Sequence, residues 1–278
     1  MTRVGLVVHE GRAAAVEAAR ALREGLEVDG IEVVDATGTT EGLALVVSVG
    51  GDGTFLRGAH VASHADAPVL GVKVGRVGFL TEVEPPDALD LVRAAVAGKA
   101  VVEERLAVIA EPERTATSAP PFAPQWGMNE IMVEKRARHR LVRLAVEVDG
   151  DYVTTFSADG VIVATPTGST AYSFSARGPI VAPSVPCLVV TPIAAHMVFD
   201  RSFVLADDQV VTLEVVGDEP AIVSADGRET VEVPVGTRVR IRASERRVRF
   251  VRRDGGRGFL ARVRDKFDLP GDPARPAG

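Results

Sequence analysis

Residues 43–55 of the chain read Leu-Ala-Leu-Val-Val-Ser-Val-Gly-Gly-Asp-Gly-Thr-Phe. The apolar run at 43–47 predicts a buried strand, since it is too short for a helix. The segment from Phe55 to Ser63 contains no proline and predicts a helix. Three glycines and one aspartate therefore lie at a strand-to-helix turn, where glycine lets a ligand come close to the backbone N–H groups. Because a helix N-terminus carries partial positive charge, this turn suits phosphate oxygens.

Asp52 is the exception in this turn, because a fixed negative charge repels phosphate. The carboxylate makes chemical sense if it binds a metal ion or takes a proton from a hydroxyl group that is about to be phosphorylated. The alternative is a tight turn in which Asp52 and Thr54 cap a helix. Gly-rich turns are common, so this stretch alone leaves both interpretations open.

The segments around this turn alternate between strands and helices. Strands are expected at 4–8, 31–34, 43–49 and 69–72, and helices at 12–26, 55–63 and 88–97. Such alternation predicts a parallel, Rossmann-like sheet with helices on both faces, an α/β domain over residues 1–99. Ligands bind such sheets at the carboxyl ends of the strands, which is where Gly50 to Thr54 falls.

After about residue 100 the pattern changes to short alternating strands separated by turns. Strands are expected at 105–110, 126–133, 141–148, 152–157, 160–164, 187–191, 209–215, 221–224, 230–233, 237–243 and 248–251. Asp149-Gly150 is a strong hairpin signal, and residues 112–124 form a Pro-, Ser- and Thr-rich loop. These features predict a mostly antiparallel all-β domain over residues 100–254. A helix at 260–267 is expected in a C-terminal segment, 255–278, that packs on the first domain and ends in a frayed tail.

The composition limits which binding partners and which cellular compartment are expected for the protein. A net charge of −6 argues against non-specific nucleic-acid binding, which needs a basic face. No apolar run approaches the length of a membrane span, and the chain enters the strand at 4–8 without a leader segment. The only cysteine, Cys187, permits no internal disulfide, which fits a reducing compartment. We therefore expect a cytoplasmic protein with no membrane or nucleic-acid partner.

Two further stretches are too polar for their apolar flanks. One is Gly127-Met128-Asn129-Glu130, inside the strand expected to begin at Trp126. An Asn-Glu pair at the mouth of a strand can offer an amide and a carboxylate to the two hydroxyls of a ribose. The alternative is an ordinary polar pair on an edge strand.

The other stretch runs Ser157-Ala158-Asp159-Gly160 and then, from residue 165 to residue 175, Thr-Pro-Thr-Gly-Ser-Thr-Ala-Tyr-Ser-Phe-Ser. Its hydroxyl and N–H groups can hydrogen-bond a nucleotide without any basic residue, and Tyr172 can lay its ring on a base or sugar. The alternative is a Ser/Thr-rich loop that leads into a capped helix.

Taken together, in this order and spacing, these three motifs resemble those of the NAD kinase family. The resemblance covers residues 3–267 and includes Gly71 to Val83 and Glu103-Glu104-Arg105. Gly-Gly-Asp-Gly-Thr alone is not specific, because lipid kinases and phosphofructokinases carry versions of it. The Thr-Pro-Thr-Gly-Ser-Thr-Ala-Tyr stretch together with Asn-Glu is much more specific.

The resemblance implies transfer of the γ-phosphoryl group of ATP, with a divalent cation such as Mg²⁺, to the 2′-hydroxyl of the adenosine ribose of NAD. It implies that Asp52 is the general base and that Gly53 belongs to the same nucleotide-contacting turn. It further implies a homodimer or homotetramer. The remaining positions that it assigns to ligand binding are Asn129 and Glu130 for the adenosine part, Thr170, Ala171, Tyr172 and Ser175 for the dinucleotide, Asp159 and Ala194 for the nicotinamide side, and Arg57 and Arg140 as phosphate contacts. Both arginines also fit a solvated surface.

Three positions depart from the family pattern. Arg177 stands where glycine is usual, so a positive φ there would strain the turn. Lys73 replaces a residue that is commonly asparagine, and Arg228 stands where some members have glutamine.

Two other functions remain alternatives: a lipid kinase that shares the glycine turn, and a non-catalytic nucleotide sensor, for which Arg177 is the best reason. A zinc enzyme is the weakest, because His60 and His64 share a helix face but have no further ligand nearby.

Overall fold

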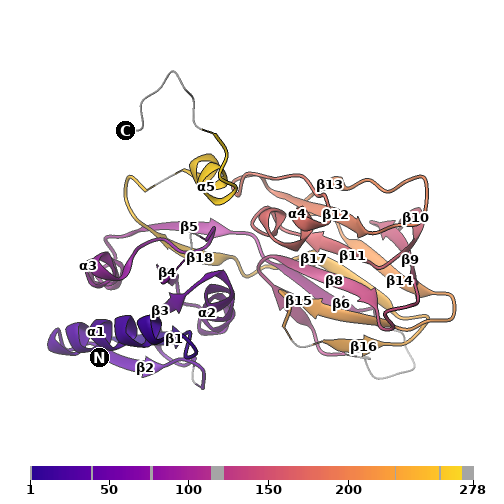
Figure 1. Ribbon diagram of the computed structural model, residues 1–278. Helices are drawn as coiled ribbons and strands as arrows, with labels where there is room; N and C mark the ends of the chain where they lie inside the picture. The colour runs from indigo at the N-terminus through magenta and orange to yellow at the C-terminus, as the bar shows by residue number, and fades with distance from the viewer. Residues whose placement is uncertain are drawn as a thin grey trace. The chain divides into compact units, whose positions relative to one another are not determined.

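The structure is a computed structural model that describes residues 2–38, 40–75, 78–113, 122–228, 230–256 and 258–270. The chain divides into two compact units (Figure 1). The first unit comprises Met1–Glu104 together with Val248–Gly278, and the second comprises Arg105–Arg247. The chain therefore leaves the first unit once and returns to it near the C-terminus. No helix in the described part is long and apolar enough to cross a membrane.

The first unit is built on a six-stranded sheet with the order β2-β1-β3-β4-β18-β5. Its pairs β1–β2, β1–β3, β3–β4 and β4–β18 are parallel. The elements are β1 (Arg3–Val8), α1 (Ala13–Val28), β2 (Glu32–Asp35), β3 (Leu43–Gly50), α2 (Asp52–Ala65), β4 (Val69–Lys73), α3 (Pro85–Val96), β5 (Val101–Arg105), β18 (Val248–Arg252) and α5 (Phe259–Lys266). This arrangement confirms the predicted α/β class.

Alternation along β3 assigns the helices to the two faces of this sheet. Leu45, Val47 and Val49 belong to a core cluster that also contains the buried residues of α1 and α3. The residues between them point to the other face, where Gly58 of α2 lies against Val46 and Ser48. Because Phe55 of α2 is fully buried and stacks on Phe250 of β18 at 4.4 Å between ring centroids, α2 is fixed firmly against the sheet.

The second unit consists of two six-stranded antiparallel sheets, β10-β9-β14-β17-β6-β7 and β13-β12-β11-β8-β15-β16. One core cluster takes alternate residues from both sheets, such as Leu144 and Leu213 from the first and Val163 and Leu188 from the second. The strands are β6 (Val108–Pro112), β7 (Gln125–Gly127), β8 (Glu130–Lys135), β9 (Val142–Val148), β10 (Asp151–Ala158), β11 (Gly160–Ala164), β12 (Cys187–Ile193), β13 (Phe203–Ala206), β14 (Val211–Val216), β15 (Ala221–Ala225), β16 (Val231–Val233) and β17 (Arg238–Ala243).

Strand β11 is buried on both faces, which explains its unbroken apolar sequence. Val161 and Val163 face the core between the sheets, whereas Ile162 and Ala164 form a second cluster with Cys187 and Val189. Ala176 and Val181 pack against this second cluster. The polar turn that follows β11 is therefore laid over the outer face of its own sheet, together with the 3₁₀ turn η1 (Gly168–Thr170) and the short helix α4 (Tyr172–Ser175).

The structure corrects two details of the sequence-based picture and confirms a third. The strand expected at 248–251 forms, but it pairs with β4 in the first unit and not with the β domain. The single strand expected at 126–133 is two strands, β7 and β8, interrupted at Met128 and Asn129. The hairpin at Asp149-Gly150 is confirmed between β9 and β10. Residues 114–121 of the expected loop and the tail from residue 271 lie outside the described residues.

Candidate active site

Asp52 is the first residue of α2, three residues earlier than the helix start expected at Phe55. Gly51 is the N-cap and has no side chain, so the amides of the first helical turn lack a side-chain acceptor from the N-cap. Adding a Cβ atom to Gly50 would place it 2.5 Å from Thr54 Oγ1. Gly50 is thus needed because the chain turns sharply from β3 into α2.

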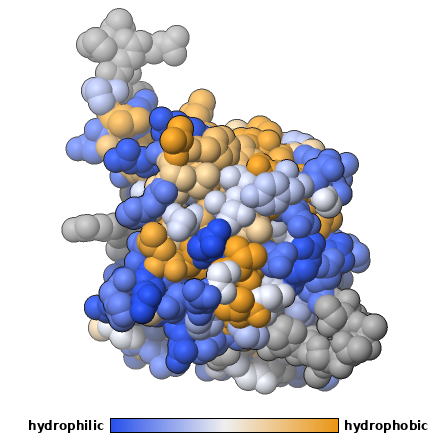
Figure 2. All heavy atoms as spheres, turned by 90° about the vertical axis from the view of Figure 1, so that its right-hand side faces the viewer, coloured by the Kyte–Doolittle hydropathy of each residue, from blue (hydrophilic) through white to orange (hydrophobic). Residues whose placement is uncertain are grey.

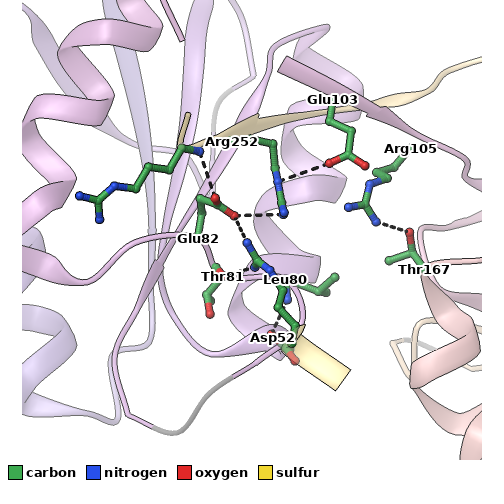
Figure 3. A network of polar contacts seen from close by, with 10 residues as sticks. Asp52, Leu80, Thr81, Glu82, Glu103, Arg105, Thr167 and Arg252 are labelled. Carbon is green, nitrogen blue, oxygen red and sulfur yellow. Dashed lines mark hydrogen bonds and ion pairs between the residues drawn. The ribbon is translucent and has the colours of Figure 1, made fainter. Parts of the chain in front are cut away.

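Two backbone amides hold the carboxylate of Asp52. The N–H of Phe79 donates to Oδ2 at 3.0 Å. The N–H of Leu80 donates to Oδ1 at 3.1 Å (Figure 3). Gly78 makes this approach possible, because a Cβ atom there would lie 2.1 Å from Oδ1. Amide donors stabilise a carboxylate and fix its plane, so Asp52 is held in one orientation at the start of α2.

A buried ion-pair network supports the segment that carries these amides. The side chain of Glu82 is 1% exposed and pairs with Arg252 at 3.0 Å and Arg262 at 2.6 Å. Arg262 also donates to the carbonyl of Thr81 at 3.0 Å, and Arg252 pairs with Glu103 at 3.3 Å (Figure 3). Two arginines on different elements therefore fix the chain beside residues 79 and 80. Breaking such a pair by removing one partner would leave a buried charge uncompensated.

In the second unit, the break between β7 and β8 presents Asn129 and Glu130. Both residues are buried, at 7% and 8% exposure. The carbonyl of Asn129 accepts from the N–H of Thr165 at 2.8 Å, and the carbonyl of Met128 accepts from Thr165 Oγ1 at 2.7 Å. Gly168 lies directly behind, where a Cβ atom would come 2.0 Å from the Asn129 carbonyl oxygen. The structure thus brings the Asn-Glu pair and the Thr-Pro-Thr-Gly turn together, as the motifs suggest.

The carboxyl group of Glu130 is buried without a complete set of partners. Its Oε2 atom has no hydrogen-bond partner among the described residues. Burial, and secondarily the charge of Asp226, raise the pKa of Glu130 to about 8. A buried polar atom left unpaired needs an explanation, and a ligand hydroxyl group is one that fits.

This raised pKa predicts how stability depends on pH. The unfolded chain loses the Glu130 proton near pH 4.5, whereas the folded protein keeps it until about pH 8. The contribution of Glu130 to the free energy of unfolding is therefore fully present below pH 4.5 and is lost as the pH rises from 4.5 through 8. Glu130→Gln removes this loss, so its free energy of unfolding should exceed that of the parent by on the order of 2–4 kcal/mol more at pH 8.5 than at pH 5.

Urea unfolding at the two pH values measures this difference. Glu104→Gln, a change at an exposed carboxylate, is the control. An equal effect of Glu130→Gln at both pH values would contradict a protonated Glu130 in the folded protein.

The turn after β11 is held by its own hydroxyl groups. Ser169 Oγ donates to the carbonyl of Pro166 at 2.6 Å and accepts from the N–H of Val181 at 2.9 Å. Thr170 Oγ1 donates to the carbonyl of Thr167 at 3.2 Å. Arg105 donates to Thr167 Oγ1 at 3.4 Å, within this second unit (Figure 3). The hydroxyl groups of Thr167, Ser169 and Thr170 are therefore engaged in hydrogen bonds within the second unit. Fewer hydroxyl groups are available to a ligand than the motif suggests.

The remaining predicted residues of this stretch lie at the end of the turn. Ala171 is the N-cap of α4, and Tyr172 and Ser175 are the first and last residues of that helix. Tyr172 is 43% exposed, so its ring is available to a ligand. Of these residues and Thr170 before them, Thr170 is the one whose side chain makes a hydrogen bond within the described part of the chain.

Asp159 and Ala194 are brought close by pairing of β11 with β12. The N–H of Asp159 donates to the carbonyl of Ile193 at 2.9 Å, and Ala194 follows directly with φ of 47°. The carboxylate of Asp159 pairs with Lys135 of β8. The two positions that the motif assigns to one side of the ligand are therefore neighbours.

The two predicted phosphate arginines have other partners. Arg57 donates to the carbonyl of Val8 at 3.2 Å, and Arg140 lies 3.6 Å from Glu219 with 62% of its side chain exposed. Neither contact involves another predicted site residue. The surface interpretation explains both contacts, and a phosphate role stays a prediction.

Arg177 adopts a left-handed backbone, with φ of 68°. This is the conformation for which glycine is favoured, so the departure from the family pattern has a cost in strain. Its N–H donates to the carbonyl of Phe174 at 2.9 Å, and Gly178 next to it approaches Ser173 so closely that a Cβ atom would lie 2.3 Å from Ser173 Oγ. The turn therefore keeps its shape despite the arginine.

We expect Arg177→Gly to raise the free energy of unfolding by about 1 kcal/mol, because it relieves this strain. Chemical denaturation measures the change. Arg177→Ala is the matched control, since it removes the charged group but keeps the Cβ atom that causes the strain. If both variants gained the same stability, loss of the side chain and not backbone strain would be the cause.

The other two departures also have structural partners. Lys73 pairs with Glu84 at 2.8 Å, and this contact lowers the pKa of Glu84. Arg228 donates to the carbonyl of Trp126, and its positive charge lowers the pKa of Asp226 against the effect of burial. Lys73 and Gly78 also line a cavity of about 710 Å³ in the first unit. Its other cations, Arg253 and Arg262, already pair with Asp87 and Glu82, so its charges indicate no ligand class.

Among the described residues, no group of three or more His, Cys, Asp or Glu side chains is arranged to hold a metal ion. The rings of His60 and His64 lie 4.5 Å apart, edge to face, which is a packing contact on one helix face. The histidine pair thus carries no further support for a zinc enzyme.

Comparison with known proteins decides the family. The ATP-NAD kinase N-terminal domain matches residues 37–100, and the ATP-NAD kinase C-terminal domain matches residues 128–253. The chain belongs to the NAD kinase family. It is thus an enzyme of the NAD kinase class, as its three motifs predicted.

Curated NAD kinases align with nearly the whole chain. The NAD kinase of Thermobifida fusca is 40% identical over 290 residues, which cover 95% of this chain and 89% of that protein. NAD kinase 1 of Streptomyces avermitilis is 38% identical over 325 residues, which cover 100% of this chain and 90% of that protein.

Solved structures of NAD kinases share the fold. An NAD kinase from Archaeoglobus fulgidus in complex with ATP superposes with a TM-score of 0.77 at 29% identity, covering 95% of this chain and 99% of that one. Yeast NADH kinase complexed with NADH superposes with a TM-score of 0.82 at 22% identity, covering 100% and 89%. The yeast comparison shows the fold alone.

Two residues beside these NAD kinase motifs were not predicted from the sequence. Gly78 admits the amides that hold Asp52, and Asp226 contacts the backbone beside Asn129. An Asp-Gly turn after a strand was the available signal for Asp226, but it is typical of any tight turn.

Proposed function

We propose that this NAD kinase transfers the γ-phosphoryl group of ATP to the 2′-hydroxyl of the adenosine ribose of NAD, giving NADP and ADP. The observation that carries the proposal is the carboxylate of Asp52, fixed by two amides at the start of α2 in a chain of this family. The Archaeoglobus fulgidus relative was solved with ATP, which supports ATP as the donor.

In the proposed reaction, Asp52 accepts the proton of the attacking hydroxyl. The hydroxyl oxygen forms a bond to the γ-phosphorus while the bond from that phosphorus to the bridging oxygen of ADP breaks. Phosphoryl transfer depends mainly on positioning and neutralisation of charge, so a base of fixed orientation contributes by aligning the nucleophile. Each Asp52 oxygen keeps a lone pair beyond the one that the amide uses, and that lone pair is available to the hydroxyl.

We assign the binding of the adenosine part to Asn129 and Glu130, whose side chains project from a backbone fixed on both sides. Thr170, Ala171, Tyr172 and Ser175 contact the dinucleotide, and Asp159 and Ala194 its nicotinamide side. Gly53 contacts nucleotide in the turn of Asp52. These roles follow the family motif, and the neighbouring placement of Asp159 and Ala194 supports the last pair.

A divalent cation, with Mg²⁺ the best candidate, neutralises the charge of the triphosphate. The described residues form no three-ligand cluster, and Mg²⁺ is commonly held by one or two carboxylates together with substrate phosphates and water. Asp52 is the carboxylate that the phosphate-binding turn offers. A cation that arrives with ATP therefore fits the residues present.

We further propose a homodimer or homotetramer located in the cytoplasm. Strand β13 lies at the edge of its sheet, and the side chain of its Val204 is 54% exposed. In the segment before β13, Val198 is fully exposed and Phe199 is 41% exposed. Figure 2 shows apolar patches among charged side chains on one face of the molecule. An exposed apolar edge strand is a surface that a second copy can cover.

The test is NADP formation from NAD, ATP and magnesium by the purified protein, read with an NADP-specific dehydrogenase. We expect NADP from the parent protein and none without ATP. Tight NAD binding without NADP, at saturating ATP and magnesium, would favour a nucleotide sensor. Phosphorylation of diacylglycerol or sphingosine with NAD untouched would favour a lipid kinase.

A further inference from the structure

The backbone between β7 and β8 is held by a single carboxylate, that of Asp226. Its Oδ2 accepts from the N–H of Met128 at 2.8 Å. Its Oδ1 accepts from the N–H of Asn129 at 2.7 Å and from the N–H of Glu130 at 3.1 Å. Three consecutive amides thus converge on one side chain that is 96 or more residues away in the chain. Such convergence is uncommon in a strand, whose amides normally alternate in direction.

The carbonyl groups of the same three residues are also fixed. Those of Met128 and Asn129 accept from Thr165, and that of Glu130 accepts from the N–H of Asp226 at 3.1 Å. Every backbone polar group from residue 128 to residue 130 therefore has a partner. The side chains of Asn129 and Glu130 take no part in this framework, so they are left to meet a ligand.

The local backbone is adapted to admit Asp226. Asp226 itself has a left-handed backbone with φ of 52°, and its carboxylate lies at the break between β7 and β8. Gly127 allows this close packing, because a Cβ atom there would lie 2.7 Å from the carbonyl oxygen of Glu130 and 3.1 Å from Asp226 Oδ1. Burial raises the pKa of Asp226, and the three amides together with Arg228 oppose this.

We propose that Asp226 is a positioning residue for NAD: it holds Asn129 and Glu130 in the orientation that binds the adenosine ribose. Burial, with the charge of Asp226 as the smaller cause, favours the protonated form of Glu130. This inference rests on the proposed function, in which those two residues bind the adenosine part. A protonated Glu130 can donate one hydrogen bond to a ribose oxygen and accept another, whereas the ionised form only accepts. Two charged groups influence the pKa values of this pair. Asp226 raises the pKa of Glu130, and Arg228 lowers the pKa of Asp226.

The test is steady-state kinetics of Asp226→Asn in the full-length protein. An asparagine offers one acceptor oxygen in place of two and turns an N–H₂ group toward an amide N–H, so one or two of the three bonds are lost. We expect the KM for NAD to rise about 10-fold or more, because bonds to a charged group are lost, while kcat and the KM for ATP change less than about threefold. Asp151→Asn, at an exposed residue of β10 in the same unit, is the control.

A second measurement separates positioning from mere stability. In the parent protein, calorimetric affinity for NAD should fall as the pH rises through about 8, where Glu130 ionises beside Asp226. Asp226→Asn should move this midpoint to lower pH, because it removes the neighbouring charge. An unchanged KM for NAD together with an unchanged midpoint in a folded variant would overturn the inference. If the variant did not fold, a pH-independent affinity of the parent between pH 6 and 9.5 would overturn it on its own.

The failure of this inference can be told from failure of the proposed function. Asn129→Ala and Glu130→Ala test the ligand role directly through NAD affinity. If neither changes it, the assignment of the adenosine site is wrong. If both weaken NAD binding and Asp226→Asn does not, the site stands and Asp226 is not its positioning residue.

Discussion

Asp52→Asn is expected to lower kcat about 10²- to 10⁴-fold, which is the usual contribution of a general base. Asparagine has nearly the same shape, and its side-chain oxygen can still accept from one of the amides of Phe79 and Leu80. It cannot take a proton from the attacking hydroxyl. We therefore expect the fold and most of the NAD affinity to be kept while turnover is lost.

The measurement is kcat and KM for NAD in the coupled NADP assay, with binding followed by calorimetry. Asp66→Asn is the matched control, because Asp66 is the C-cap of the same helix and asparagine also tolerates its left-handed backbone. A kcat close to that of the parent would show that Asp52 is not the base. Loss of NAD binding in parallel with kcat would instead indicate that Asp52 mainly holds the substrate.

Gly78→Ala should have the second largest effect on turnover, although Gly78 carries no functional group. The added Cβ atom would lie 2.1 Å from Asp52 Oδ1, so one of the two must move. The atom that it meets is the end of a flexible side chain, so the carboxylate turns away and the fold remains. Because a displacement of about 1 Å in a reacting group can cost about 10²-fold, we expect kcat to fall by about 10- to 100-fold.

Two comparisons make this prediction specific. Gly38→Ala, where an added Cβ atom would meet nothing within 4 Å, should leave kcat unchanged. In the background of Asp52→Asn, Gly78→Ala should have little further effect, because both changes act through the same carboxylate. Full additivity of the two losses in kcat would mean that Gly78 acts on turnover by another route.

The parts of this structure that were predicted are those with local signals. The strand, glycine turn and helix around Asp52 follow from a short apolar run and from residues that are permissive in the turn. The hairpin at Asp149-Gly150 follows from a dipeptide that favours positive φ. Both depend on interactions within a few residues, so the sequence contains the necessary information at one place.

The parts that were missed depend on long-range pairing. Strand β18 has the same alternation as its neighbours in the sequence, and only its pairing with β4, far away in the chain, assigns it to the first unit. At the interruption, the amides of Met128, Asn129 and Glu130 donate to Asp226, a residue far away in the chain, and no local propensity reveals this contact. Gly78 was missed for the same reason, because its role becomes apparent only when the fold places Asp52 beside it.

The return of the chain to complete the first sheet also has a consequence for biosynthesis. Because β18 lies between β4 and β5 in that sheet, the first unit lacks an internal strand until residue 252 has left the ribosome. The second unit, Arg105–Arg247, is complete earlier. We therefore expect the domain inserted in the middle of the chain to acquire its native structure before the domain that is translated first. A nascent chain from which residues up to 247 have emerged, but not β18, would hold a folded β sandwich tethered to an immature nucleotide-binding turn.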